Sequence, residues 1–479
     1  MSVVVVSFLA CIAGFAVIGG AAAAKARGSA ADYLVASRSV SPWLTALSSA
    51  ATNNSGFMFI GLFGFTYRFG VQAVWLQAGW ILGDVIAWLW IHRRVRARAG
   101  ELDASSVPRL LATDEAGATS RAMVVVIGAL TLLFLGGYAA AQLKAGSAAL
   151  SGMFGWAPWI GISIGAVIVV VYCIAGGLRA SIWTDAAQAL VMIGALVALL
   201  VFAMAKVGGP GALASALAAE DPALVRWLPD GLAFGLGVYW LGFVFGGLGA
   251  IGQPHILIRS MAIESEAGIG RARLIYFLWY VPFSIAAVAT GLYARVLVPD
   301  LTAGVDAAAA AVAAEASLPA VANLLLPDVL LGLLLAGVFA ATMSTADSQI
   351  LACSAAITQD VVPRWRTSLV ASKLATLSVA ALALGIALWA DAAVFRLVLA
   401  AWSALGATLG PVLIVRLARR PLPPWLGVVM IAAGLGTVFT WATPYGGDAF
   451  ELLPGMLVPL ALYGVATLAG LVRPAPSRA

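Results

Sequence analysis

Charged residues are scarce in this chain, and their scarcity excludes most soluble architectures. Only 10% of the 479 residues are Asp, Glu, Lys or Arg, whereas 62% are hydrophobic. A soluble globular domain carries about 25% charged residues. The net charge of +6 does not indicate nucleic acid, because the basic residues lie in short loops between apolar stretches. We therefore expect a membrane protein whose surroundings are the lipid bilayer, with no nucleic-acid partner.

Histidine and cysteine are nearly missing as well. The chain has two histidines and three cysteines, and Cys11, Cys173 and Cys353 all lie in apolar stretches. This odd number builds no disulfide framework and no zinc motif. An intramembrane enzyme needs a nucleophile–base pair or a metal cluster, and two scattered histidines supply neither. We predict a protein that is not an enzyme and has no obligate protein partner.

Long apolar runs are abundant. Thirteen stretches are long enough to cross about 30 Å of hydrocarbon, and the first of them, 3–23, is read as a true membrane helix. With the N-terminus outside, 21 of the 27 Lys and Arg residues fall in inner segments, as the positive-inside rule requires. The chain is thus expected in the plasma (inner) membrane with a cytoplasmic C-terminus. The other stretches are 43–67, 72–91, 120–147, 155–176, 183–206, 232–254, 272–297, 323–357, 369–390, 393–415, 424–442 and 449–471.

One of these stretches carries a polar cluster. Residues 337–357 read GVFAATMSTADSQILACSAAI and bring the hydroxyls of Ser344, Thr345 and Ser348 close to Asp347. A carboxylate near mid-bilayer costs roughly 2.5–3.5 kcal/mol and needs a partner or a wet cavity. Oxygen ligands on adjoining helical turns suit a hard cation such as sodium better than zinc or copper. The pattern indicates half of an ion site.

Two other stretches are interrupted. The sequence AATNNSG at 50–56 places polar residues and poor helix formers in mid-span, and GGLGAIGQPHILIR at 246–259 does so five spans later. Broken helices at corresponding positions of two halves indicate the binding site of a secondary transporter. Hydrogen bonding between ordinary packed helices is the alternative reading of the first segment.

Four segments in order resemble the sodium:solute symporter family, and within it the proline permeases. They are ADYLVASRSVSPWLTALSSAATNNSG (31–56), GGLRASIWTDAAQ (176–188), GQPHILIRSM (252–261) and ATMSTADSQILACSAAIT (341–358). The resemblance implies an all-α, polytopic protein of thirteen transmembrane helices with two inverted five-helix repeats. The single domain, 1–479, then divides into an extra N-terminal helix at 3–23, a first repeat at about 43–206, a second at about 232–415 and two C-terminal helices at 424–471.

The resemblance also implies ion sites. The shared sodium site would use the backbone carbonyls of Ala51, Asn54 and Ala341 and the hydroxyls of Ser344 and Thr345. A second sodium site would lie between Asp185, Asp347 and Ser348. Asp185 has two other readings, as a helix cap or as a partner of Arg179, and Asp347 has one, as a side chain hydrogen-bonded to its neighbours. Arg259 is interpreted as an inner-gate or headgroup-binding residue.

Substrate residues are expected beside the two breaks. This chain departs from the proline branch, which carries an aspartate at the place of Asn53 and aromatics at the places of Gly246 and Ala250. Loss of those rings would enlarge the pocket or change what the solute stacks against. Tyr138 is read either as a substrate contact or as interhelical packing. The candidate set is Asn53, Ser55, Gly56, Tyr138, Gln142, Gly246, Ala250 and Pro254.

These observations predict a sodium-coupled symporter that imports a small organic solute by alternating access. An amino acid such as proline, or a related carboxylate, fits best. The alternatives are a proton-coupled symporter, which the replacement of aspartate by Asn53 keeps open, and a sodium-coupled transporter of a sugar or another organic solute. The coupling ion is expected to be sodium.

Overall fold

The computed structural model describes residues 2–389, 394–441 and 449–472, and most of the chain in these ranges is helical. No strand occurs in the described part, which holds only the isolated bridges Val40–Ile263 and Thr113–Thr119. The expected all-α, polytopic fold is therefore confirmed. Residues 390–393 and 442 of the expected spans lie outside the described residues.

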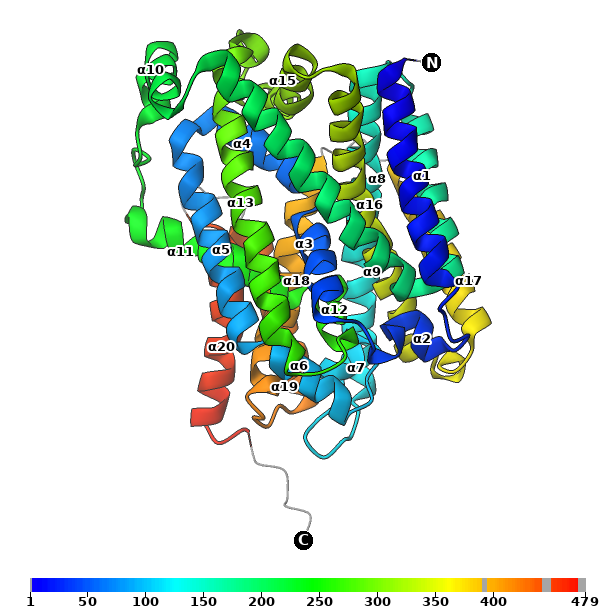
Figure 1. Ribbon diagram of the computed structural model, residues 1–479. Coiled ribbons are helices and arrows are strands. Elements are labelled where there is room, and N and C mark those ends of the chain that lie inside the picture. Colours follow the sequence, from blue (N-terminus) through cyan, green and yellow to red (C-terminus); the bar gives the residue numbers. More distant parts are fainter. Residues whose placement is uncertain (1, 390–393, 442–448, 473–479) are drawn as a thin grey trace.

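The long helices form one bundle, and most of the shorter helices lie at its two ends (Figure 1). The long helices are α1 (Val3–Ala23), α3 (Pro42–Phe59), α5 (Ala73–Trp90), α8 (Arg121–Phe154), α9 (Pro158–Val207), α11 (Gly235–Leu248), α13 (Gly268–Leu297), α16 (Asp328–Ala355), α17 (Leu369–Trp389), α18 (Val394–Leu417), α19 (Pro424–Trp441) and α20 (Leu452–Leu468). The short ones are α2 (Ala30–Val35), α4 (Gly61–Phe69), α6 (His92–Glu101), α7 (Val107–Ala112), α10 (Pro210–Glu220), α12 (Pro254–Ala262), α14 (Ala307–Ala314) and α15 (Ser317–Leu325).

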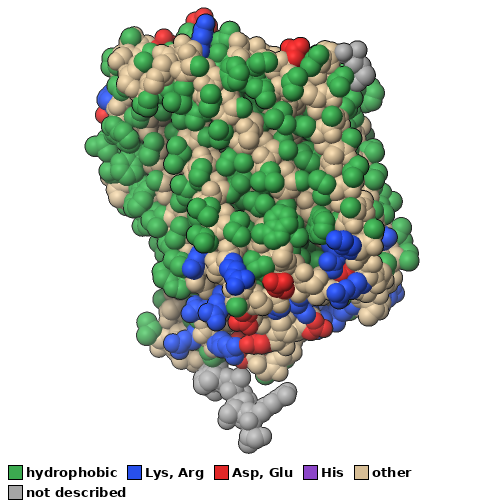
Figure 2. All heavy atoms as spheres, viewed as in Figure 1, with side chains coloured by type: hydrophobic (Ala, Val, Ile, Leu, Met, Phe, Trp, Pro, Cys, Tyr) green, Lys and Arg blue, Asp and Glu red, His purple; other side chains and the backbone are tan. Residues whose placement is uncertain are grey.

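The two ends of the bundle differ in charge. On the face drawn in Figure 2, a broad hydrophobic band covers the middle, and Lys and Arg side chains gather at the end that holds α6 and α7. The first helix, α1, begins at the opposite end (Figure 1). A hydrophobic band with basic side chains gathered at one end is typical of a membrane-spanning protein.

Fewer than thirteen helices qualify as membrane spans when length and composition are the criteria. In the described residues eleven helices are long and apolar enough to cross a membrane. The segment 449–471 yields α20, of 17 residues, and so falls just short. The segment Ala308–Leu325 is counted, although it consists of two short helices, α14 and α15, at one end of the bundle. The count of thirteen is therefore not reproduced by this measure.

Helix α9 explains part of the difference, because it is a hairpin of two helical arms. Its start, Pro158, contacts Ser147 near the end of α8, and its end leads to Gly208, which contacts Tyr293 near the end of α13. Its middle residue Arg179 contacts α2 at the basic end. The chain reverses at Gly177, which has φ 55° and ψ −143°. Two of the expected spans, 155–176 and 183–206, correspond to these two arms.

Both expected breaks are present. Helix α3 is interrupted at Ser55, whose φ of 46° and ψ of −173° are not helical. The second break is a short 3-10 turn, Gly249–Gly252, followed by Gln253 in an extended conformation and by α12 with Pro254 at its first turn. Proline is tolerated there because the first turn of a helix needs no internal N–H donor.

The hairpin yields a stability prediction. A Cβ atom on Gly177 would lie 2.3 Å from the carbonyl oxygen of Tyr33, and the positive φ adds strain. Gly177→Ala is therefore expected to lower the free energy of unfolding by about 1–3 kcal/mol, read as a lower melting temperature in detergent. Gly194→Ala, on the same helix with no atom within 4 Å of the added Cβ, is the matched control. Equal melting of the two variants would contradict the reversal at Gly177.

Candidate functional site: a buried ion cluster beside two broken helices

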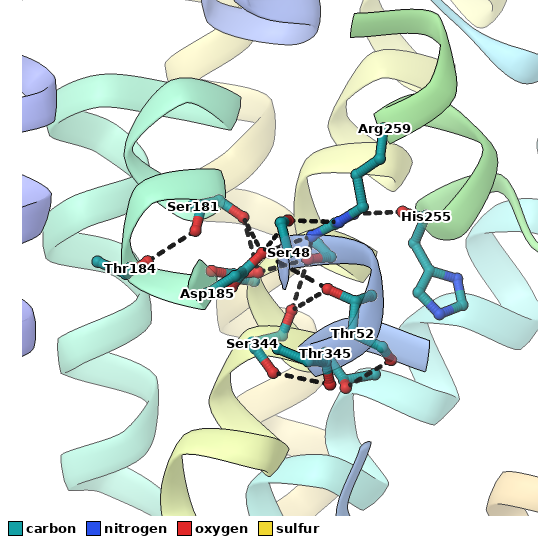
Figure 3. Close-up of polar contacts among 12 residues, drawn as sticks. Ser48, Thr52, Ser181, Thr184, Asp185, His255, Arg259, Ser344 and Thr345 are labelled. Carbon is teal, nitrogen blue, oxygen red and sulfur yellow. Dashed lines mark hydrogen bonds and ion pairs between the residues drawn. The ribbon is translucent and has the colours of Figure 1, made fainter. Parts of the chain in front are cut away.

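Oxygen atoms from α3 and α16 meet in the centre of the bundle. The Ser344 hydroxyl lies 3.3 Å from the carbonyl oxygen of Ala51 and 3.1 Å from that of Ala341. The Thr345 hydroxyl lies 3.1 Å from the carbonyl oxygens of Thr52 and Ala341. Figure 3 shows Thr52, Ser344 and Thr345 facing one another across the two helices.

This group has more acceptors than protons. Two hydroxyls can donate two hydrogen bonds, yet three carbonyl oxygens converge on them, and all five residues are at most 1% exposed. Surplus lone pairs in a buried site favour a small cation with oxygen ligands. Four of the five expected sodium ligands are thus brought together. The carbonyl of Thr52, which the sequence did not suggest, also faces this group. The side chain of Asn54 donates to the carbonyl of Ala50 at 2.6 Å, and the Asn54 carbonyl as a sodium ligand stays a prediction.

A guanidinium group occupies the neighbouring space. Arg259 projects from α12 and is fully buried, and its Nη2 lies 2.8 Å from Oδ2 of Asp185. The same arginine donates from Nε to the Ser48 hydroxyl at 2.8 Å and from Nη2 to that of Ser348. Ser48 in turn donates to Asp185 at 2.7 Å (Figure 3). Arg259 is therefore not a headgroup contact, and that part of the interpretation was wrong, while its reading as an inner-gate residue stays a prediction.

Asp347 belongs to the same cluster. It accepts hydrogen bonds from Tyr172 at 2.7 Å, Ser181 at 3.0 Å and Ser348 at 2.6 Å. Ser181 also lies 3.5 Å from Asp185. The three residues expected at a second sodium site therefore lie in one cluster, in which Arg259 pairs with Asp185 and Asp347 accepts only from hydroxyl groups among the described contacts.

The alternative pairing of Asp185 with Arg179 is not found. Arg179 instead binds Asp32 of α2 at 2.6 Å, at the basic end of the bundle. Burial opposes ionisation of Asp32, but hydrogen bonds from Arg179, the Arg27 backbone and Ser37 outweigh burial and lower the pKa of this carboxyl. Asp185 lies within α9 and does not cap a helix start.

Expected substrate residues gather around the break in α3. The Gly56 N–H donates to Oε1 of Gln142 at 3.1 Å, and the Tyr138 hydroxyl bonds Ser55. Asn53 donates from Nδ2 to Asp84 at 3.1 Å and to the Tyr276 hydroxyl at 2.6 Å. Among the described residues, Asn53 Oδ1, Gln142 Nε2 and Trp80 Nε1 are buried without a hydrogen-bond partner. Unpaired buried polar atoms are rare in proteins and mark places where a ligand can bind.

Aromatic rings fill the space near the second break. The rings of Phe57 and Trp80 stack with centroids 5.4 Å apart, and those of Trp80 and Trp402 with centroids 5.5 Å apart. A Cβ on Gly246 would lie 2.6 Å from Nε1 of Trp80. The indole of Trp402 donates to the carbonyl of Gly246 at 2.9 Å. The space beside Gly246 is therefore filled by Trp80 and Trp402, which come from other helices.

Some residues near the site were missed. Asp84, Trp80 and Trp402 lie on α5 and α18, which carry no helix break and no polar run. The signal available was Asp84 itself, a carboxylate within the apolar stretch 72–91. Ala250 and Pro254, both expected at the substrate, are buried at the second break without a polar side chain to offer.

A larger cavity, of about 250 Å³, lies on the other side of the break in α3. It is lined by residues of α3, α8, α14, α15 and α16 and of the short connections between them, and Glu315 is the one charged residue in this lining. This cavity brings together no set of oxygen ligands, so the polar chemistry of the protein is concentrated at the breaks.

The comparisons with known proteins agree with this geometry. The model of the sodium:solute symporter family matches residues 33–420. The chain belongs to the sodium:solute symporter family. It is 31% identical over 437 residues to a sodium/proline symporter of Salmonella typhimurium, covering 89% of this chain and 85% of that protein. It is 28% identical over 438 residues to the high-affinity proline transporter PutP of Bacillus subtilis, covering 90% of each.

The fold is also found among solved structures. A Na+-coupled sialic acid symporter in a substrate-bound, outward-open state superposes with a TM-score of 0.80 over 99% of each chain, at 19% identity. The nucleobase-cation-symport family transporter Mhp1 superposes with a TM-score of 0.56. Both likenesses concern the fold alone.

The buried ion pair yields a prediction of its own. Arg259→Met leaves Asp185 buried without its partner, which is expected to cost about 3–5 kcal/mol of stability. Arg259→Met combined with Asp185→Asn removes both charges and is expected to recover most of that loss. Melting temperatures of the two single variants and the double variant form the cycle. Additive losses would show that the two side chains do not stabilise each other.

Proposed function

We propose that this member of the family imports a small amino acid, with proline as the first candidate, by symport with sodium and alternating access. The observation that carries the proposal is the group of five oxygens between the broken helix α3 and helix α16, beside unpaired polar atoms at the break. The relatives named as proline transporters support the choice of solute.

Sodium would be held by the carbonyls of Ala51, Thr52 and Ala341 and by the hydroxyls of Ser344 and Thr345. The ion replaces hydrogen bonds that α3 and α16 otherwise make to each other. Its binding therefore favours one relative position of the two helices over others. Binding of the solute at the adjacent break selects the same arrangement, and each ligand must then raise the affinity for the other by the same factor.

A second sodium is proposed between Asp185, Asp347 and Ser348. Two carboxylates and one guanidinium leave an excess negative charge in a fully buried cluster. An unbalanced charge in such a place is costly, and a bound cation would neutralise it. Thr52 lies 3.5 Å from Asp185 and 3.3 Å from the Ser344 carbonyl, so the two proposed ion sites share a residue.

The solute is placed beside Asn53, Ser55, Tyr138 and Gly246. The half-helix that begins at Gly56 directs backbone N–H groups into this region, and such termini bind carboxylates. The orientation proposed is an outer N-terminus and an inner, basic end with the cytoplasmic C-terminus. The two inverted repeats, about 43–206 and 232–415, are proposed as the parts that move against each other.

The first test is uptake of radiolabelled proline into proteoliposomes. An inward sodium gradient is expected to drive accumulation above that in vesicles with potassium on both sides. Sodium-driven uptake of another amino acid, a short carboxylate or a sugar in place of proline would retain the mechanism and change the solute. Uptake that follows a pH gradient and ignores sodium would contradict the sodium assignment and favour the proton-coupled alternative.

The ion ligands are tested by Ser344→Ala combined with Thr345→Ala. Loss of two ligands is expected to raise the sodium concentration for half-maximal uptake roughly tenfold or more, with unchanged folding. Ser354→Ala is the control, because this hydroxyl, also on α16, bonds the carbonyl of Ser372 instead. If the double variant keeps the sodium dependence of the unaltered protein, the ion lies elsewhere.

A further inference from the structure

A carboxylate without a cationic partner is buried on α5. Asp84 is 2% exposed, and its Oδ2 accepts hydrogen bonds from Asn53 Nδ2 and from the Tyr276 hydroxyl. Among the described residues, none of the recorded ion pairs involves Asp84. Two neutral donors do not balance a full negative charge in a low-dielectric interior. The site therefore favours a ligand that brings a positive charge.

Asp84 lies at one of two small cavities that share a wall. Each has a volume of about 10 Å³, the size of a single water. The shared wall is formed by Asn53, Phe57, Trp80 and Trp402. The first cavity is completed by Asn54, Met58, Asp84, Gly247 and Tyr280, and the second by Ser55, Tyr138, Val398 and Leu399.

Different polar groups lie at the two cavities. At the first, the unpaired Oδ1 of Asn53 and the carboxylate of Asp84 are acceptors. The second is lined by Ser55, where α3 breaks, and beside this break the Gly56 N–H donates to Gln142 Oε1 while Gln142 Nε2 is a donor without a partner. Apolar faces of Phe57, Trp80 and Trp402 lie between them. A ligand that fits has a cationic end, a short apolar body and an anionic end.

We infer that Asp84 is a solute-binding residue that pairs with the ammonium group of a zwitterionic amino or imino acid, whose carboxylate lies at the half-helix beginning at Gly56. The inference rests on the proposed function and specifies its substrate class. To make room, the solute separates the Trp80 ring from its stacking partners and joins the two cavities. Ammonium then replaces the Asn53 amide as the partner of Asp84, and the faces of the displaced rings add cation–π attraction.

The test compares two ligands of one shape on the purified full-length protein with saturating sodium. Proline carries a ring ammonium, and tetrahydrofuran-2-carboxylate has an ether oxygen at the same place. The unaltered protein is expected to bind proline at least 30-fold more tightly, and Asp84→Asn to lose most of this preference through weaker proline binding alone. Binding is measured by thermal stabilisation or by displacement of labelled proline. The control is Asp360→Asn, a change at a buried carboxylate in the segment Ala356–Val361 that follows α16, and this variant keeps the preference.

An exchange variant guards against misfolding. Asn53→Asp combined with Asp84→Asn moves the carboxylate across a 3.1 Å contact without altering charge or composition. It is expected to regain part of the preference for proline. A preference that survives in Asp84→Asn would overturn the inference, as would equal binding of both ligands by the unaltered protein.

Other outcomes separate this inference from the proposed function. If Asp84→Asn keeps its preference for proline and instead needs far more sodium, Asp84 holds the coupling ion and the inference is wrong. Sodium-driven uptake of a solute that lacks an ammonium group would also overturn it, while the symport mechanism stands. Proline binding that depends on Asp84 in a protein whose uptake ignores sodium would support the inference and contradict the coupling.

Discussion

The buried guanidinium of Arg259 is the interaction on which the centre of this bundle depends. It arises on α12, binds Asp185 on α9, and reaches Ser48 of α3 and Ser348 of α16. Four helices, far apart in sequence, are thereby held around one charge. A desolvated ion pair adds little net stability over an apolar core, but a pair with one partner removed is strongly destabilising. The cluster therefore determines which helices contact one another, and it adds little to the overall stability of the bundle.

The Arg259 cluster also determines how the break in α3 is presented to a ligand. Because α3 is held by this cluster just before its break at Ser55, its second half is free to present backbone groups to a ligand. Irregular backbone at membrane depth is tolerated only where protein or a polar cavity satisfies it. Gln142 and Ser55 supply such partners to the N–H groups of Gly56 and Phe57. The break is thus stabilised by side chains that a solute carboxylate can replace.

Much of this could be predicted from the sequence, for local reasons. The polar run around Asp347 and the interruption at 50–56 stand out against apolar surroundings. Both also lie in segments that resemble the sodium:solute symporter family, which assigned them to the ion and substrate sites. The burial of Arg259 could not be predicted, because a charged residue near the expected end of a span looks the same whether it turns outward or inward. Its direction is set by α12, which follows the break at Gly249–Gly252 and points the side chain into the bundle.

The pocket beside Asn53 could not be deduced for a different reason. The sequence showed an amide where the proline permeases carry a carboxylate, and small residues at Gly246 and Ala250 where they carry rings. The structure sets a carboxylate, Asp84, against that amide and an indole, Trp80, against Gly246. These pairs of residues come from separate helices and leave no local pattern in the sequence. Read alone, Asn53 and Gly246 therefore suggested that a carboxylate and a ring were missing, whereas the folded protein brings both groups from α5.

The stack of Phe57, Trp80 and Trp402 has a consequence for the resting protein. Its rings come from α3, α5 and α18, so relative movement of these helices at this level must separate them. Each aromatic pair contributes about 0.5–1.5 kcal/mol beyond its buried area. Two pairs therefore favour the closed arrangement by a factor of roughly 5 to 150. Without solute the stacked rings therefore oppose separation of α3, α5 and α18 beside the break.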